Sequence, residues 1–284
     1  MAHPAALAAV QLAVEHRRAG RFDEALAAYR QAMTHDARAY EVQYSFANFC
    51  AERGRFAEAI AAYQAALAAN PQATDALNNL GAVQLMAGER TQAAETFAAV
   101  ARLDPAHYDA AMNLAQLAFE AGRHREAIAH YRRALQTRPD SITAHLALAN
   151  ALDAVREGDE ALAVVRTVLQ QAGGDLRVIG LYAHLQLRAC DWSDWERTVM
   201  AVPPALDAAE RMGFLDQVPP SLFLLLPVAR ALRGRVAAAH ARTHETVAAA
   251  SGWRARPAAA GTARGAPGRG SPCAPRHRGP AEPP

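Results

Sequence analysis

A glycine recurs every 34 residues along the first half of the chain, at Gly20, Gly54, Gly88 and Gly122. A similar phrase follows each of them: GRFDEALAAYRQAM, GRFAEAIAAYQAAL, GERTQAAETFAAVA and GRHREAIAHYRRAL. A fixed period of this length is the signature of small structural units that stack on one another. This repeat constrains the fold more strongly than any other feature of the 284-residue sequence.

Each unit contains two stretches with apolar residues at helical spacing, one before and one after the glycine. The glycine lets the chain leave the first helix with a positive φ. A proline closes the second helix of copies two to four, at Pro71, Pro105 and Pro139. The pattern therefore predicts a series of helical hairpins, and it argues against one long coiled coil. A fifth copy starts at Arg156 with its glycine displaced to Gly158.

Each copy has a small residue and a large residue at fixed positions after the turn. The positions five and nine residues after the glycine position, which is residue 156 in the fifth copy, are Ala25 and Tyr29, Ala59 and Tyr63, Ala93 and Phe97, Ala127 and Tyr131, and Ala161 and Val165. The alanines let the two helices of a hairpin approach closely, and the large residues pack against the next copy. This pattern resembles the tetratricopeptide repeat (TPR). The resemblance implies an all-α fold, a right-handed solenoid of five repeats over residues 6–175.

The sequence after the repeats predicts further helices. Leu176–Cys190 continues an apolar period and can cap the solenoid. Ser193 and Glu196 have the spacing of a capping box, which predicts a helix from Asp194. Pro203–Pro204 is expected to interrupt this helix, and a further short helix is expected after the prolines. We expect a helical extension over residues 176–250 that includes a helix over Ser221–Ala249.

The last residues, 251–284, are rich in Arg, Pro, Gly and Ala and predict a disordered tail. A nucleic-acid-binding tail and the product of an out-of-frame reading of a GC-rich gene are alternative interpretations. The net charge of +2 argues against nucleic acid as a partner of the whole chain.

The segment Leu185–Val199 follows the repeats directly and contains Cys190, Asp191 and Trp192. This order resembles the junction between repeats and catalytic lobes in the protein O-linked N-acetylglucosamine transferase (SPINDLY-like) family. The resemblance implies a role in recruiting protein substrates. The family's glycosyltransferase lobes have no counterpart here, because the sequence has neither a strand pattern nor a glycine-rich phosphate turn. We therefore assign no catalytic residue and expect no cofactor.

The cysteines, the apolar runs and the N-terminus indicate the cellular location. Cys50, Cys190 and Cys273 lie far apart, which favours a reducing compartment without disulfides. No apolar run approaches the length of a membrane span, and the N-terminus lacks the basic start of a signal peptide. We expect a cytoplasmic protein. His240 and His244 share a helix face without a third ligand, so no metal site is predicted.

The concave face of the repeats is the candidate binding surface, because the first helix of each pair lines it in TPR proteins. Its predicted residues are Tyr44, Asn48, Asn78, Asn79, Met112, Asn113, Gln116 and Asn150. An asparagine side chain carries a donor and an acceptor and can hold a peptide backbone whatever its sequence. The transferase family uses such a ladder. The alternative is that these side chains merely face solvent.

The sequence thus predicts a scaffold that binds protein or peptide segments, the recruiting part of an O-GlcNAc transferase-like polypeptide. Two alternatives stay open. One is an active transferase, moving GlcNAc from UDP-GlcNAc to Ser or Thr, with its catalytic half supplied elsewhere. The other is a free-standing TPR adaptor for assembly or secretion.

Overall fold

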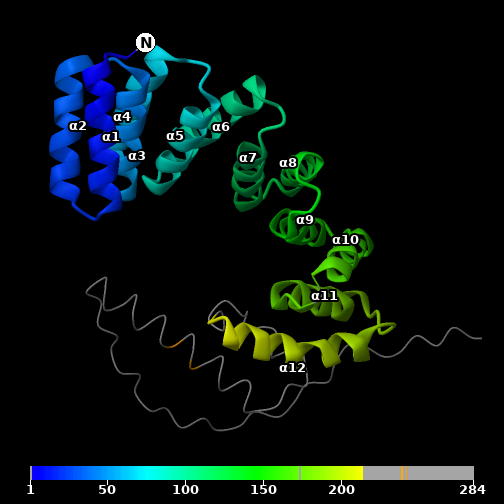
Figure 1. Cartoon of the computed structure of the whole chain (residues 1–284). Helices are drawn as coiled ribbons and strands as arrows, with labels where there is room; N and C mark the ends of the chain where they lie inside the picture. Colours follow the sequence, from blue (N-terminus) through cyan, green and yellow to red (C-terminus); the bar gives the residue numbers. More distant parts are fainter. Residues whose placement is uncertain (1, 173, 214–237, 239–240, 242–284) are drawn as a thin grey trace, which may run out of the picture. The chain divides into compact units, whose positions relative to one another are not determined.

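The computed structural model describes residues 2–172, 174–213, 238 and 241. These residues form twelve α-helices and no strand, which confirms the all-α prediction (Figure 1). The predicted disordered tail over 251–284 and the pair His240 and His244 lie outside the described residues. The same holds for nearly all of the helix predicted over Ser221–Ala249.

The chain divides into two compact units, residues 1–157 and 158–284. The helices of unit 1 are α1 (Pro4–Arg18), α2 (Phe22–Asp36), α3 (Tyr40–Glu52), α4 (Phe56–Ala69), α5 (Thr74–Met86), α6 (Arg90–Leu103), α7 (Tyr108–Glu120), α8 (His124–Thr137) and α9 (Ile142–Ala154). The described helices of unit 2 are α10 (Gly158–Gln171), α11 (Leu176–Ala189) and α12 (Trp195–Arg211).

Unit 1 consists of four antiparallel hairpins, α1–α2, α3–α4, α5–α6 and α7–α8, followed by α9. The four repeated glycines sit in the hairpin turns with φ between 69° and 84°. The equivalent turn after α9 has Arg156 with φ of 66°, although a residue with a Cβ is strained there. The second helices α4, α6 and α8 end two residues before Pro71, Pro105 and Pro139, as predicted.

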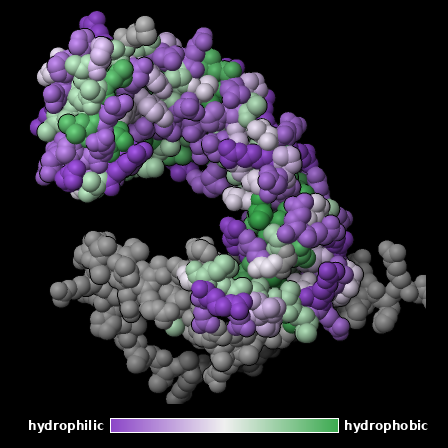
Figure 2. Space-filling model, in the orientation of Figure 1, coloured by the Kyte–Doolittle hydropathy of each residue, from purple (hydrophilic) through white to green (hydrophobic). Residues whose placement is uncertain are grey.

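The core of unit 1 contains many alanines and one large ring from each of its four second helices. Tyr29, Tyr63, Phe97 and Tyr131 are almost wholly buried, and the alanines four residues before them are fully buried. Burying a side chain of this size contributes about 1.5–3 kcal/mol. Hydrophilic side chains cover most of the visible face of this unit, with apolar ones in small separate patches (Figure 2).

The core of unit 2 lies between α11 and α12. Ile179 and Ala183 of α11 pack against Val202 and Leu206 of α12, and all four are buried. Thr198 is also buried there and donates from its hydroxyl to Gln186 Oε1 at 2.9 Å.

Two predictions about α12 are wrong. The capping box does not form, because α12 has Asp194 as its N-cap and Ser193 lies one residue before it, where its hydroxyl donates to Asp191 Oδ1 at 2.7 Å. The Asp194 side chain makes no capping bond either. The helix also continues through Pro203–Pro204 to Arg211. Both prolines lie on the exposed side of α12, where the carbonyl groups that lose their N–H partners can reach water. The opposite side stays packed on α11.

Candidate functional site

All eight predicted site residues lie on first helices of unit 1. Tyr44 and Asn48 are on α3, Asn78 and Asn79 on α5, Met112, Asn113 and Gln116 on α7, and Asn150 on α9. Gln116 and Asn150 are exposed, and the other six are half-buried. We call the surface that these eight side chains mark the first-helix face.

Hydrogen bonds bring three of these residues together across neighbouring hairpins. Asn79 Nδ2 donates to the Tyr44 hydroxyl at 3.2 Å and to Asn48 Oδ1 at 3.4 Å. Tyr63, from α4, also donates from its hydroxyl to Asn48 Oδ1. The interaction between Asn48 and Asn79 links residues 31 positions apart, so it ties the second hairpin to the third.

Each amide of this cluster keeps one group unused. Asn48 Nδ2 donates to no described residue, and Asn79 Oδ1 accepts from none. The two side chains therefore retain one donor and one acceptor between them, which are the groups that a single peptide unit of a bound chain requires.

Aromatic rings surround this amide pair. The rings of Tyr40 and Tyr44 stack with centroids 5.4 Å apart, and Tyr44 meets Tyr63 edge-on at 6.0 Å. Burial raises the pKa of Tyr63 well above its ordinary value, so its hydroxyl remains a donor at neutral pH. Sequence reasoning assigned Tyr63 to packing alone and did not single out Tyr40. The spacing of four residues between Tyr40 and Tyr44 on one helix was the available signal.

Gln116 is occupied by contacts within the protein. It accepts from the Tyr131 hydroxyl at 3.1 Å and donates to Glu120 Oε1 at 2.7 Å, and Arg90 also donates to Glu120. The hydrogen bond from Gln116, followed by that from Arg90, lowers the pKa of Glu120. Gln116 thus belongs to a network that joins α6, α7 and α8.

The other predicted residues stand apart from both networks. Asn78 Oδ1 is buried and has no hydrogen-bond partner in the described part of the chain. The structure gives Asn113 and Asn150 no side-chain hydrogen bond to another described residue. Met112, on α7, is half-buried.

Cys50 is buried, and Trp192 and Trp195 contact each other. Burial raises the pKa of the Cys50 thiol to about 11, which keeps it protonated. Trp192 is half exposed and meets Trp195 edge-on, and Trp195 packs on the core of unit 2.

Among the described residues, no group of three or more His, Cys, Asp or Glu is placed to hold a metal ion. None of the described helices has the length and apolar character needed to cross a membrane.

Comparison with known families agrees with the hairpin geometry. One tetratricopeptide-repeat model matches residues 10–74, 50–107 and 78–142, and a second matches residues 118–185. Together they cover residues 10–185, more than half of the chain. The chain belongs to the tetratricopeptide-repeat family. The TPR resemblance inferred from the glycine register is thereby confirmed. No curated protein sequence matches the chain.

Several solved TPR structures are similar to this one. The pilF protein of Pseudomonas aeruginosa has a TM-score of 0.58 at 18% identity, covering 73% of this chain and 91% of its own. A MamA structure has a TM-score of 0.55 at 21% identity, covering 60% and 92%. YrrB, described as a TPR protein with an unusual peptide-binding site, has a TM-score of 0.54 at 18% identity, covering 64% and 97%. At these identities the likeness shows the TPR fold alone.

Proposed function

We propose that this TPR protein is an interaction scaffold that binds extended peptide segments of other proteins along the first-helix face. The observation that carries the proposal is the pair Asn48 and Asn79, which hydrogen-bond to one another across two hairpins. Each retains one amide group directed to no described residue. Such a pair can bridge the N–H and C=O groups of a peptide backbone.

The surroundings of the pair favour a peptide. The stacked rings of Tyr40 and Tyr44 supply apolar contact area next to the amides at a small cost in side-chain entropy. The amides are neutral, so the cluster reads the backbone and not a charged side chain. A peptide-binding site is also what the description of YrrB assigns to that similar TPR protein.

The same proposal includes a division of the chain. The repeats occupy residues 6–175, a capping and linking segment residues 176–250, and a tail residues 251–284. The partners are protein segments, without nucleic acid or membrane, and the location is cytoplasmic. These points rest on the sequence patterns described above.

A more specific role has less support. The role as the recruiting part of an O-GlcNAc transferase-like polypeptide depends on the Cys190–Trp192 segment, and the TPR matches above lend it no support. The same applies to an active transferase with its catalytic half supplied elsewhere. A free-standing TPR adaptor is compatible with every match, so we favour it as the form of the scaffold.

The test is a selection of peptides followed by affinity measurement. Twelve-residue peptides selected by display against the purified chain should bind in solution, as measured by calorimetry. Replacing both Asn79 and Asn113 by Ala should weaken binding of unrelated selected peptides by similar factors. Two lost neutral hydrogen bonds correspond to roughly a 5- to 150-fold loss of affinity. Salt should have little effect, because the contacts carry no charge.

Gln64→Ala is the matched control, because Gln64 is an exposed residue of the second helix α4. It should bind every selected peptide as the unchanged protein does. Because Asn79 also bonds within the protein, circular dichroism must show that the double variant remains folded. If the folded double variant keeps its affinity, the first-helix face is not the binding surface.

A further inference from the structure

A pocket of about 360 Å³ lies between α10, α11 and α12 in unit 2, and none of the predicted site residues lines it. This volume is within the range of pockets that hold ligands or anchoring side chains. Its lining residues are Arg166, Leu169, Gln170, Ile179, Tyr182, Asp194, Arg197, Thr198 and Ala201.

One side of the pocket is lined by apolar residues that belong to the core of unit 2 or pack against it. Ile179 is buried in the core of unit 2, and Leu169 and Ala201 pack against that core. These three residues come from three different helices. They form a floor suited to an aliphatic side chain.

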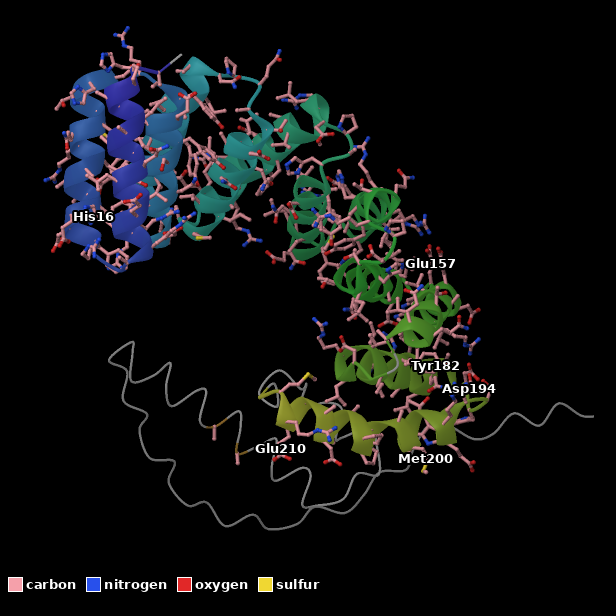
Figure 3. The ribbon with its side chains drawn as sticks, in the orientation of Figure 1. His16, Glu157, Tyr182, Asp194, Met200 and Glu210 are labelled. Atoms are coloured by element: carbon pink, nitrogen blue, oxygen red, sulfur yellow. The ribbon has the colours of Figure 1, made fainter. Side chains whose placement is uncertain are left out.

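The polar side is organised around Arg166. Its Nε donates to the Tyr182 hydroxyl at 3.1 Å, and that hydroxyl donates to Asp194 Oδ2 at 3.2 Å. Its Nη2 also donates to Asp191 Oδ2 at 3.3 Å. Tyr182 and Asp194 lie close together near the turn between α11 and α12 (Figure 3). The charge of Arg166 is therefore balanced by two carboxylates of the protein.

Arg197 differs from Arg166. It is exposed and makes no ion pair with any described residue. The amide of Gln170, which also lines the pocket, has no described partner either. The Gln170 amide carries both a donor and an acceptor, so it is electrically neutral, whereas no described carboxylate lies within ion-pair distance of Arg197. The positive charge of Arg197 is therefore the one that a bound carboxylate can pair with.

We propose that this pocket is a second binding site, which takes an acidic segment of a partner protein. A Glu or Asp carboxylate pairs with Arg197, and a neighbouring aliphatic side chain lies on the floor of Leu169, Ile179 and Ala201. A peptide fits better than a small molecule because two tryptophans lie close to a lining residue, Asp194, in the sequence. Trp195 follows Asp194 directly, and Trp192 beside it is 52% exposed. Exposed tryptophans are typical anchors of protein interfaces.

The test uses the full chain and blocked fluorescent peptides in which one glutamate lies between leucines. Anisotropy should show saturable binding, and the otherwise identical glutamine peptide should bind at least about tenfold more weakly, since a hydrogen bond to a charged group is lost. Arg197→Gln should cause a similar loss for the glutamate peptide alone. Higher salt should weaken binding of that peptide.

Three controls make the result specific. Arg211→Gln removes an exposed arginine at the end of the same helix, outside the pocket, and should change nothing. Ala201→Phe fills the floor and should abolish binding while the helical signal is retained. The double variant at Asn79 and Asn113 should bind this peptide normally, which separates this site from the first-helix face.

Several results would overturn the proposal. They are equal affinity for the glutamate and glutamine peptides, no saturable binding, or full affinity in both Arg197→Gln and Ala201→Phe. Displacement of the peptide by free hexanoate at equal concentration would instead identify the pocket as a small-carboxylate site.

Discussion

The ring of Phe97 occupies the space that a side chain at Gly81 would need. A Cβ atom built on Gly81 would lie 2.7 Å from Cε1 of Phe97 and 2.9 Å from Cζ. The other four repeats have alanine in this register, at Ala13, Ala47, Ala115 and Ala149. The third hairpin therefore packs its ring closer to the first helix than an alanine would permit.

Gly81→Ala should lower the stability of the protein. In an open helix the change would gain about 1 kcal/mol, but overpacking a core costs typically 1–3 kcal/mol. Phe97 is fully buried, so its ring cannot move aside into solvent. We expect a net loss of about 1 kcal/mol, measured by urea unfolding. Adding Phe97→Leu should recover part of the loss, and a raised stability of Gly81→Ala alone would contradict the close packing.

The repeat register explains which parts of the fold could be predicted. The glycines and prolines act through their own backbone restrictions, so their positions fix the turns and the helix ends. The capping box at Ser193 failed because the helix starts one residue later than its spacing requires, with Asp194 as the N-cap. The break at Pro203 failed because burial of Val202 and Leu206 on the opposite side holds α12 against α11.

The candidate site was predictable in outline only. The register placed Asn48 and Asn79 on first helices of neighbouring hairpins. Which of their amide groups stay unused depends on bonds from Tyr63 and Tyr44, and no sequence pattern specifies those bonds. The pocket beside Arg197 was missed because its lining comes from three helices, in a part of the chain where the repeats had lost their regular pattern.

Gly88→Val should destabilise the third hairpin through its backbone alone. Gly88 has φ of 84°, and a Cβ there would meet nothing within 4 Å. A β-branched residue at positive φ is strained, which costs about 1–3 kcal/mol. Thermal melting followed by circular dichroism should show the loss. Gly158→Ala, at a position without positive φ and with open space, is the control and should melt within a few degrees of the unchanged protein.

Arg156→Gly should raise stability. Arg156 occupies the register position of the hairpin glycines and has φ of 66°. A left-handed conformation costs a residue with a Cβ about 1–2 kcal/mol, and part of that gain is offset by the entropy of glycine in the unfolded chain. We expect a net increase of up to about 1 kcal/mol in urea unfolding. Arg133→Gly, at an exposed position within α8, should instead lower stability, by about 1 kcal/mol. If both substitutions destabilise equally, the left-handed turn at 156 is not strained.

Stability should fall in mildly acidic solution because of His130. Burial lowers the pKa of His130 below its ordinary value of 6.5, while Glu126 opposes the shift and Arg133 adds to it. The unfolded chain therefore binds a proton at a higher pH than the folded protein does, so stability is complete above pH 6.5 and decreases as the pH falls toward the folded pKa. In His130→Gln this titration is absent, so the difference in stability between pH 7.5 and pH 5 should be smaller than in the unchanged protein. Urea unfolding at both pH values measures the two differences. An equal decrease in both proteins would mean that His130 is charged in the folded state and that its burial does not govern its proton affinity.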